Sequence, residues 1–346
     1  MTAAINLLRA ALLSNEAATA AFNAWQSAVD IDTLPPAQNT LLPILARNLE
    51  RLNIDHPWLP RLKGIYRRTW YANQVALRTQ ADVITALNAA NLPALVIGAA
   101  ALASTAYPEL AQRPIHAGEI VVPPDTVDET IGTLNNMGWR AEPASPRQGN
   151  PSFRTWAAGL RFVNGQKQVL WLRWHGIPDI PCAHLDADFW TNAIPFDLES
   201  ASAHTLSPTH HLLRSCQTAG THNLIPLADA AMLIRQGEID WSTLVRLATT
   251  YELTLPVHAT LKTLADSLGL PIPNHVLPTL AEVNPGWLNR QAQRATWTDP
   301  TSRAILDRVG IHLARFRHMA YGHNIIPGPQ QLLAYLRANR PNARFL

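Results

Sequence analysis

The sequence of 346 residues predicts an α/β (α+β) fold, in which a small β-sheet is flanked by an N-terminal and a C-terminal helical region. Residues 92–122 combine short apolar runs typical of buried strands with an alanine-rich helical stretch. In residues 160–174, Asn164-Gly165 joins two runs rich in β-forming residues, which favours a tight hairpin turn. Apolar residues recur at helical spacing before residue 90 and after residue 206. These observations predict helices over 1–90, an α/β core over 91–200 and helices over 201–346.

The stretch 92–122 has the clearest local pattern. Residues 94–97 form an apolar run that ends at Gly98, as expected for a short buried strand. Residues 99–106 are strong helix formers without a breaker. Tyr107-Pro108 ends this helix, because the residue before a proline is pushed out of the α region. Residues 119–122 then form a second strand, which two prolines terminate.

The flanking elements follow from the same rules. Ser14 is placed to cap a second helix, and residues 61–90 form the longest helix. Asp125 is a plausible cap for a helix that ends before Gly138, and a polar, proline-rich loop follows at 142–152. The arginines on the long helix are better explained as a solvated face than as a phosphate-binding rim; they are Arg67, Arg68 and Arg78.

Composition excludes several classes of protein. The formal charge is +3, and no window is rich in lysine or arginine, so nucleic-acid binding is not supported. No apolar run approaches the length of a membrane span, of roughly 18 residues. Cys182 and Cys216 lie far apart, which argues against a disulfide framework or a zinc site. We therefore expect a cytoplasmic globular protein with no nucleic-acid or membrane partner.

At Gly98, Tyr107-Pro108 and Arg113-Pro114 the chain resembles the uncharacterised bacterial nucleotidyltransferases, a branch of the polymerase-β-like superfamily. A second stretch, 206–241, resembles the same family through its Leu-x-Asp helix and its Ile-Asp-Trp turn. The resemblance implies a small mixed β-sheet of the nucleotidyltransferase type as the core. For an active enzyme it also implies Mg²⁺ as cofactor and a nucleoside triphosphate as substrate, whereas an inactive member would need no cofactor.

The acidic residues that this family uses are mostly absent. Its Asp-x-Asp falls on Ala117 and Glu119, and its third acid, on a neighbouring strand, falls on Trp171. The family has a lysine directly before this glycine, and here that position is Ile97. Magnesium prefers several hard oxygen ligands, and a lone carboxylate cannot hold two metal ions. A cationic Arg173 two residues after Trp171 would further oppose cation binding.

Glu119 is therefore the only catalytic or metal-binding acid that the resemblance leaves. Gly98 and Arg113 are the nucleotide-binding residues that it implies. Gly98 would let a phosphate approach the backbone, although a tight strand-to-helix turn would equally favour glycine. The fork of Arg113 would hold either a phosphate or a neighbouring carboxylate.

Other polar and aromatic residues have weaker signals. His116 and His175 are weaker candidates, as metal ligands that would replace the missing acids. His222 resembles a family histidine, but it fits a structural role as well. Tryptophans in strands are best explained as core residues, among them Trp139, Trp171 and Trp174.

Three functions fit this sequence. The favoured one is a pseudoenzyme that binds a nucleotide or a protein partner without efficient transfer. The second is an active metal-dependent enzyme that transfers a nucleoside monophosphate to a hydroxyl group of a small molecule, sugar or protein. The third is a structural interaction module whose ancestral pocket is filled by Trp171.

Overall fold

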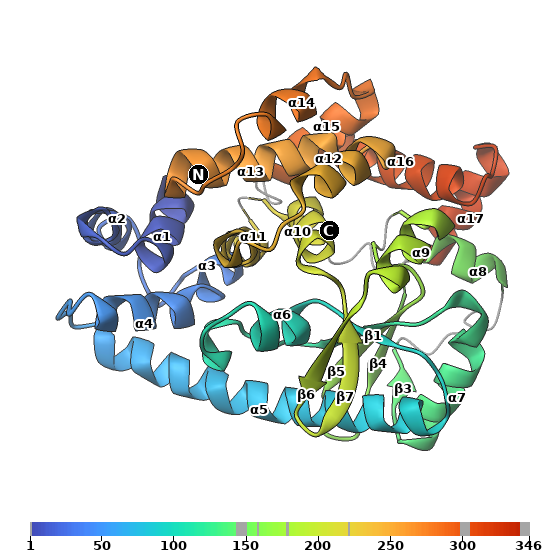
Figure 1. Ribbon diagram of the computed structural model, residues 1–346, viewed down its shortest axis with the longest axis horizontal. Coiled ribbons are helices and arrows are strands. Elements are labelled where there is room, and N and C mark those ends of the chain that lie inside the picture. Colours follow the sequence, from blue (N-terminus) through green and yellow to red (C-terminus); the bar gives the residue numbers. More distant parts are fainter. Residues whose placement is uncertain are drawn as a thin grey trace. The chain divides into compact units, whose positions relative to one another are not determined.

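The computed structural model describes residues 2–142, 151–157, 159–177, 180–220, 222–297 and 305–339. Within these ranges the chain forms two compact units, each built from separate segments of sequence (Figure 1). The first, here called the helical unit, comprises Met1–Val75, Leu102–Ile115 and Pro208–Ser302. The second, here called the sheet unit, comprises Ala76–Ala101, His116–Ser207 and Arg303–Leu346. The division into three consecutive regions stays a prediction.

The sheet unit contains one seven-stranded sheet with the strand order β3-β4-β5-β2-β1-β7-β6. Two neighbouring pairs are parallel, β1 with β7 and β2 with β5, and the other pairs are antiparallel. The mixed α/β fold predicted from the sequence is therefore confirmed. The strands are β1 (Leu95–Val96), β2 (Gly118–Val121), β3 (Arg140–Ala141), β4 (Leu160–Val163), β5 (Val169–Arg173), β6 (Ile194–Leu198) and β7 (Ala201–Thr205).

The central strands form where the apolar pattern places them. Leu95, Val96 and Ile120 are buried and lie on the paired strands β1 and β2. The predicted hairpin is the antiparallel pair β4 and β5, but its predicted tight turn is wrong, because residues 164–168 connect the strands and Lys167, not Gly165, has a positive φ of 62°. The predicted helix after Gly98 is α6 (Ala99–Thr105).

The hairpin of β6 and β7 has no clear signal in the sequence. Its turn places Glu199 at a positive φ of 54°, without the asparagine or glycine that usually marks such a turn. Strand β7 has the sequence ASAHT, which is poor in β-branched and aromatic residues. Pairing with β1 and β6 fixes this segment as a strand despite its weak propensity.

Helices complete the sheet unit, and a cluster of aromatic side chains joins three of them. Trp156, Phe316 and Tyr335 are buried together. Their ring centroids lie 5.4–6.3 Å apart. The helices are α7 (Val127–Asn136), α8 (Pro151–Trp156), α9 (Ala183–Thr191), α16 (Ile305–Gly322), α17 (Pro329–Asn339) and the 3₁₀ turn η2 (Pro124–Thr126).

The helical unit is entirely α-helical apart from its loops and one 3₁₀ turn, within the residues described. Helix α5 (Leu59–Ala89) begins in this unit and ends in the sheet unit, and α6 does the reverse. The other elements are α1 (Thr2–Leu12), α2 (Glu16–Gln26), α3 (Pro36–Asn39), α4 (Leu42–Arg51), η1 (Leu110–Gln112), α10 (Pro208–Thr218), α11 (Ile225–Gln236), α12 (Trp241–Thr250), α13 (Thr254–Leu268), α14 (Val276–Glu282) and α15 (Trp287–Trp297).

Two predicted helix caps are wrong. Asn15, not Ser14, caps α2, because its side chain accepts a hydrogen bond from the backbone N–H of Ala17 at 3.1 Å. Asp125 lies within the 3₁₀ turn η2, and α7 begins only at Val127. The predicted loop at 142–152 falls mostly outside the described residues, and Pro151 already begins α8.

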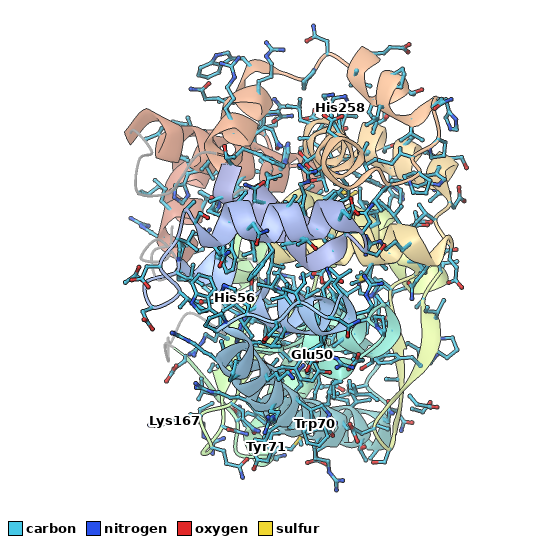
Figure 2. All side chains as sticks on the ribbon, turned by 90° about the vertical axis from the view of Figure 1, so that its left-hand side faces the viewer. Glu50, His56, Trp70, Tyr71, Lys167 and His258 are labelled. Atoms are coloured by element: carbon cyan, nitrogen blue, oxygen red, sulfur yellow. The ribbon has the colours of Figure 1, made fainter. Side chains whose placement is uncertain are left out.

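The long helix α5 follows its predicted pattern. Leu62, Leu77 and Ile84 are buried, whereas Arg67 and Arg68 are exposed, as expected of a solvated face. Trp70 and Tyr71 also remain exposed on this helix, by 49% and 68% (Figure 2). No helix in the described part of the chain is long and apolar enough to cross a membrane.

Candidate functional site

The turn after β1 places Gly98 beside the strand that carries Glu119. Gly98 has a positive φ of 68°, which a residue with a side chain rarely adopts. One residue earlier, the N–H of Ile97 donates to the backbone carbonyl of Glu119 at 3.0 Å. Strand pairing therefore brings together the two candidates of the sheet unit, and the tight turn accounts for glycine at position 98.

The carboxylate of Glu119 forms an ion pair with Arg173. In the parallel pair of β2 and β5, Glu119 lies opposite Trp171, and Arg173 follows two residues later on the same face. The Nε of Arg173 donates to Oε1 of Glu119. Both side chains are largely buried, with exposed fractions of 13% for Glu119 and 15% for Arg173. The surviving acid is thus neutralised by a cation from the adjacent strand.

Two neighbours hold Arg173 in this position. Its guanidinium lies 5.0 Å from the ring centroid of Trp171, within the range of a cation–π interaction. Gly159 leaves space on the other side, since a Cβ there would lie 2.7 Å from the carbonyl oxygen of Leu172 and 3.1 Å from Cγ of Arg173. A larger residue at 159 would clash first with the backbone of β5 and would also crowd the side chain of Arg173.

Trp171 lies between charged side chains on one face of the sheet. Arg161 on β4 lies opposite Trp171, and Arg161 forms an ion pair with Glu142. Trp171 is half-buried, whereas Trp139 and Trp174 are each only 3% exposed. The core interpretation therefore holds for Trp139 and Trp174 but is wrong for Trp171, whose indole lies between two ion pairs.

The residues at this face do not fit a magnesium site. The register places Trp171 directly opposite Glu119, so the residue beside this acid is an indole and not a second carboxylate. Among the residues that the structure describes, no three histidine, cysteine, aspartate or glutamate side chains gather as metal ligands. His175 instead contacts Asp186, with Nδ1 and Oδ2 2.6 Å apart. A carboxylate bound to a guanidinium would have to lose that partner before it could bind a cation.

Arg113 belongs to the helical unit, where its side chain binds Asp229 on α11. Its Nε donates to Oδ1 at 2.7 Å and its Nη2 donates to Oδ2 at 3.0 Å, which makes the pair bidentate. The exposed side-chain fractions are 11% for Arg113 and 4% for Asp229. The arginine fork therefore holds a neighbouring carboxylate, and its nucleotide-binding role stays a prediction.

Tyr107 completes this network. Its hydroxyl group donates to Oδ1 of Asp229 at 2.7 Å. Burial, and then the negative charge of Asp229, raise the pKa of Tyr107 well above its usual value, so the phenol stays protonated and keeps donating. Tyr107 and Arg113 come from the motifs that carry the family resemblance, and Asp229 is the acid of the Leu-x-Asp helix. Sequence reasoning named all three motifs without recognising that their side chains meet.

Asn73 on α5 fixes the backbone of residues 110–115, the segment that carries Arg113. Its Nδ2 donates to the carbonyls of Leu110 at 2.7 Å and Arg113 at 2.8 Å. Its Oδ1 accepts a hydrogen bond from the N–H of Ile115 at 2.9 Å. Asn73 is fully buried. An amide on the apolar face of a helix was the sequence signal for this role.

Four further histidines differ in their burial. His210 and His211 are buried within α10, and His222 is half-buried in the turn that follows. His116 is exposed just before β2.

The sequence profile of the family described as uncharacterised nucleotidyltransferases matches residues 36–269. This match covers more than half of the chain and includes both β1–β2 and the Tyr107–Arg113–Asp229 network. The chain belongs to this nucleotidyltransferase family. No curated protein matches it.

Proposed function

We propose that this nucleotidyltransferase-family protein is a pseudoenzyme, which binds a nucleotide or a protein partner without transferring a nucleotidyl group. The observation that carries the proposal is the ion pair of Glu119 with Arg173. Nucleotidyl transfer depends on metal ions that neutralise the charge of the phosphates. Here the one acid at the family's metal position is already bound to a cation.

The face around Trp171 supports a binding role. Its half-buried indole gives an aromatic surface, and the pairs Arg161–Glu142 and Arg173–Glu119 border it. Such a surface suits stacking against a nucleobase or packing of a partner side chain. The glycine turn at Gly98 lies next to β2, the strand that carries Glu119, and would allow a phosphate close to the backbone.

Restoring the acids of the family pattern tests the proposal. The triple variant Ala117→Asp/Glu119→Asp/Trp171→Asp restores the family's acids, and calorimetric titration with Mg²⁺ should show binding that the parent lacks. Trp171→Ala is the matched control, because it removes the indole without adding an acid. Arg173→Ala is a second control, since it releases Glu119 but supplies no further carboxylate, and it should not gain Mg²⁺ binding.

Activity is measured with α-labelled ribonucleoside triphosphates and Mg²⁺. The parent should transfer no label to itself or to added hydroxyl acceptors. Nucleotide binding by the parent, measured without metal, would favour the nucleotide over the protein partner. Transfer by the parent that Glu119→Gln abolishes would overturn the pseudoenzyme and establish an active enzyme.

A further inference from the structure

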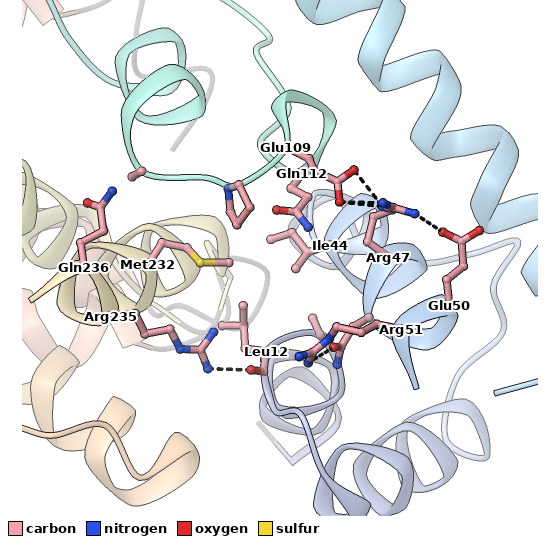
Figure 3. Close-up of a pocket in the computed structure, with 14 residues that line it drawn as sticks. Leu12, Ile44, Arg47, Glu50, Arg51, Glu109, Gln112, Met232, Arg235 and Gln236 are labelled. Atoms are coloured by element: carbon pink, nitrogen blue, oxygen red, sulfur yellow. Dashed lines mark hydrogen bonds and ion pairs between the residues drawn. The ribbon is translucent and has the colours of Figure 1, made fainter. Parts of the chain in front are cut away.

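The helical unit also contains a cavity, whose lining does not include Tyr107, Arg113 or Asp229 (Figure 3). Its volume is about 690 Å³, and its walls come from α1, α4, α11 and the segment that follows α6. This volume is within the range of pockets that hold small organic ligands, roughly 300–1,000 Å³. We call it the arginine cavity, because Arg47, Arg51 and Arg235 all line it.

The acids of the cavity are already neutralised. Arg47 binds Glu109 through Nε and Nη2, at 2.7–2.9 Å, and binds Glu50 through Nη1 at 2.7 Å (Figure 3). Glu50 also pairs with Lys63 at 3.1 Å, and the hydroxyl group of Tyr66 donates to Glu109 at 2.5 Å. The pKa of Glu50 is lowered, first by its hydrogen bond with Arg47. Both carboxylates therefore stay ionised and occupied.

The other two arginines have no carboxylate partner among the described residues. Arg51 donates from Nη2 to the side-chain oxygen of Asn48 at 2.7 Å. Arg235 donates from Nη2 to the backbone carbonyl of Leu12 at 2.6 Å. Each guanidinium has five N–H donors, so these contacts leave most of them available. Both residues are exposed, and a ligand can reach them through the open cavity.

The two guanidinium groups also repel each other. The pKa of Arg235 is lowered, first by partial desolvation and then by the positive charge of Arg51. Both arginines stand in the last turns of their helices, where the helix dipole compensates part of this charge. An anion between them would remove the repulsion and supply the acceptors that both forks lack.

The rest of the wall indicates an organic ligand. Leu12, Ile44 and Met232 give an apolar surface beside the arginines. Oε1 of Gln112 is buried in the same wall and accepts no hydrogen bond. A buried acceptor without a donor is unfavourable, so a ligand hydroxyl or N–H group would be stabilised there.

We propose that the arginine cavity binds a small organic anion, whose phosphate or carboxylate group is held between Arg51 and Arg235. The apolar part of this ligand rests on Leu12, Ile44 and Met232, and a donor group of the ligand bonds to Gln112. This site does not depend on the pseudoenzyme proposal, because it uses none of the residues on the sheet.

Calorimetric titration of the full chain with phenyl phosphate, phenylacetate and benzyl alcohol tests the site. At least one of the two anions should bind with a dissociation constant at or below about 1 mM, and the neutral alcohol should not. The anion that binds more tightly identifies the ligand as a phosphate or a carboxylate. Arg51→Gln and Arg235→Gln should each weaken binding about tenfold or more, as expected for the loss of a charge-assisted hydrogen bond.

Arg68→Gln is the matched control, because it removes the same charge from an exposed position of the same unit and should leave binding unchanged. Circular dichroism checks that each variant is folded. If Arg235→Gln unfolds through loss of its bond to Leu12, Arg51→Gln alone decides. Absence of anion binding in the parent, or parent-like affinity in Arg51→Gln, would overturn the proposal, as would binding that is lost in Arg173→Gln instead.

Discussion

Replacement of Arg113 by alanine should destabilise the helical unit rather than only weaken a ligand site. In the parent, Asp229 is 4% exposed and accepts hydrogen bonds from two nitrogens of Arg113 and from Tyr107. Arg113→Ala leaves this carboxylate buried with the phenol as its remaining partner in the network. Breaking a buried ion pair in this way costs about 3–5 kcal/mol.

The size of each contribution follows from the same contacts. Tyr107→Phe removes one hydrogen bond to a charged group and should cost about 1.5–3 kcal/mol. The double variant Arg113→Met/Asp229→Leu removes both charges together and should cost much less than the two single changes added, because no charge is left unpaired. The two positions should therefore show an interaction energy of at least about 2 kcal/mol.

Urea unfolding gives these free energies, since the free energy of unfolding falls linearly with urea concentration. The parent, the variants Arg113→Ala, Asp229→Asn and Tyr107→Phe, and the double variant are compared at one pH. Arg68→Ala controls for the loss of a surface arginine. A loss below about 1 kcal/mol in Arg113→Ala, or additive costs in the double variant, would refute the stabilising role of the Arg113–Asp229 ion pair. Arg113 would then be better explained as a ligand-binding residue.

Further predictions concern single residues. Asn73→Ala removes three hydrogen bonds to the backbone of the Arg113 loop and should lower the free energy of unfolding by about 3 kcal/mol. Asp240 caps α12, and hydrogen bonds from Ser242 and then Thr243 lower its pKa to about 2. Asp240→Ala should therefore cost about 1 kcal/mol at neutral pH. That difference should shrink as the pH falls from about 4 towards 2, because the folded pKa is below the unfolded one; unfolding curves over this pH range would show a constant difference if the cap were unimportant. Burial raises the pKa of Cys216 to about 12, so a thiol reagent at about pH 8 should label the half-buried Cys182 first, as mass spectrometry of the labelled peptides would reveal.

Local chemistry was sufficient to predict the centre of the sheet. The apolar run before Gly98 and the proline after Tyr107 each specify a conformation within a few residues. Strand β7 could not be predicted in the same way. Its sequence has little strand propensity, and it becomes a strand because β1 and β6 supply its hydrogen-bond partners.

The candidate site, too, was predictable from the sequence only in part. From the sequence, Glu119 was recognised as the one remaining acid, and Arg173 was recognised as an opposing charge. That the two form an ion pair depends on the register of β2 against β5, and on the space that Gly159 leaves for the arginine. The cavity of Arg51 and Arg235 depends on helices far apart in sequence, so no short pattern could indicate it.

The agreements and departures from the family pattern have one physical explanation. Tyr107, Arg113 and Asp229 agree with the pattern, and each has its partner within the protein. A change at any of them would leave a buried polar group unpaired, at a cost in stability whether or not the protein is an enzyme. Ala117 and Trp171 depart from the pattern at positions whose acids would serve only a metal, and clustered acids without that metal repel one another. If transfer is no longer required, as the pseudoenzyme proposal has it, folding stability alone would favour the exchange of such acids for neutral groups and for a cation that pairs with the last one. The ion pair of Glu119 and Arg173 is the arrangement that this exchange would produce.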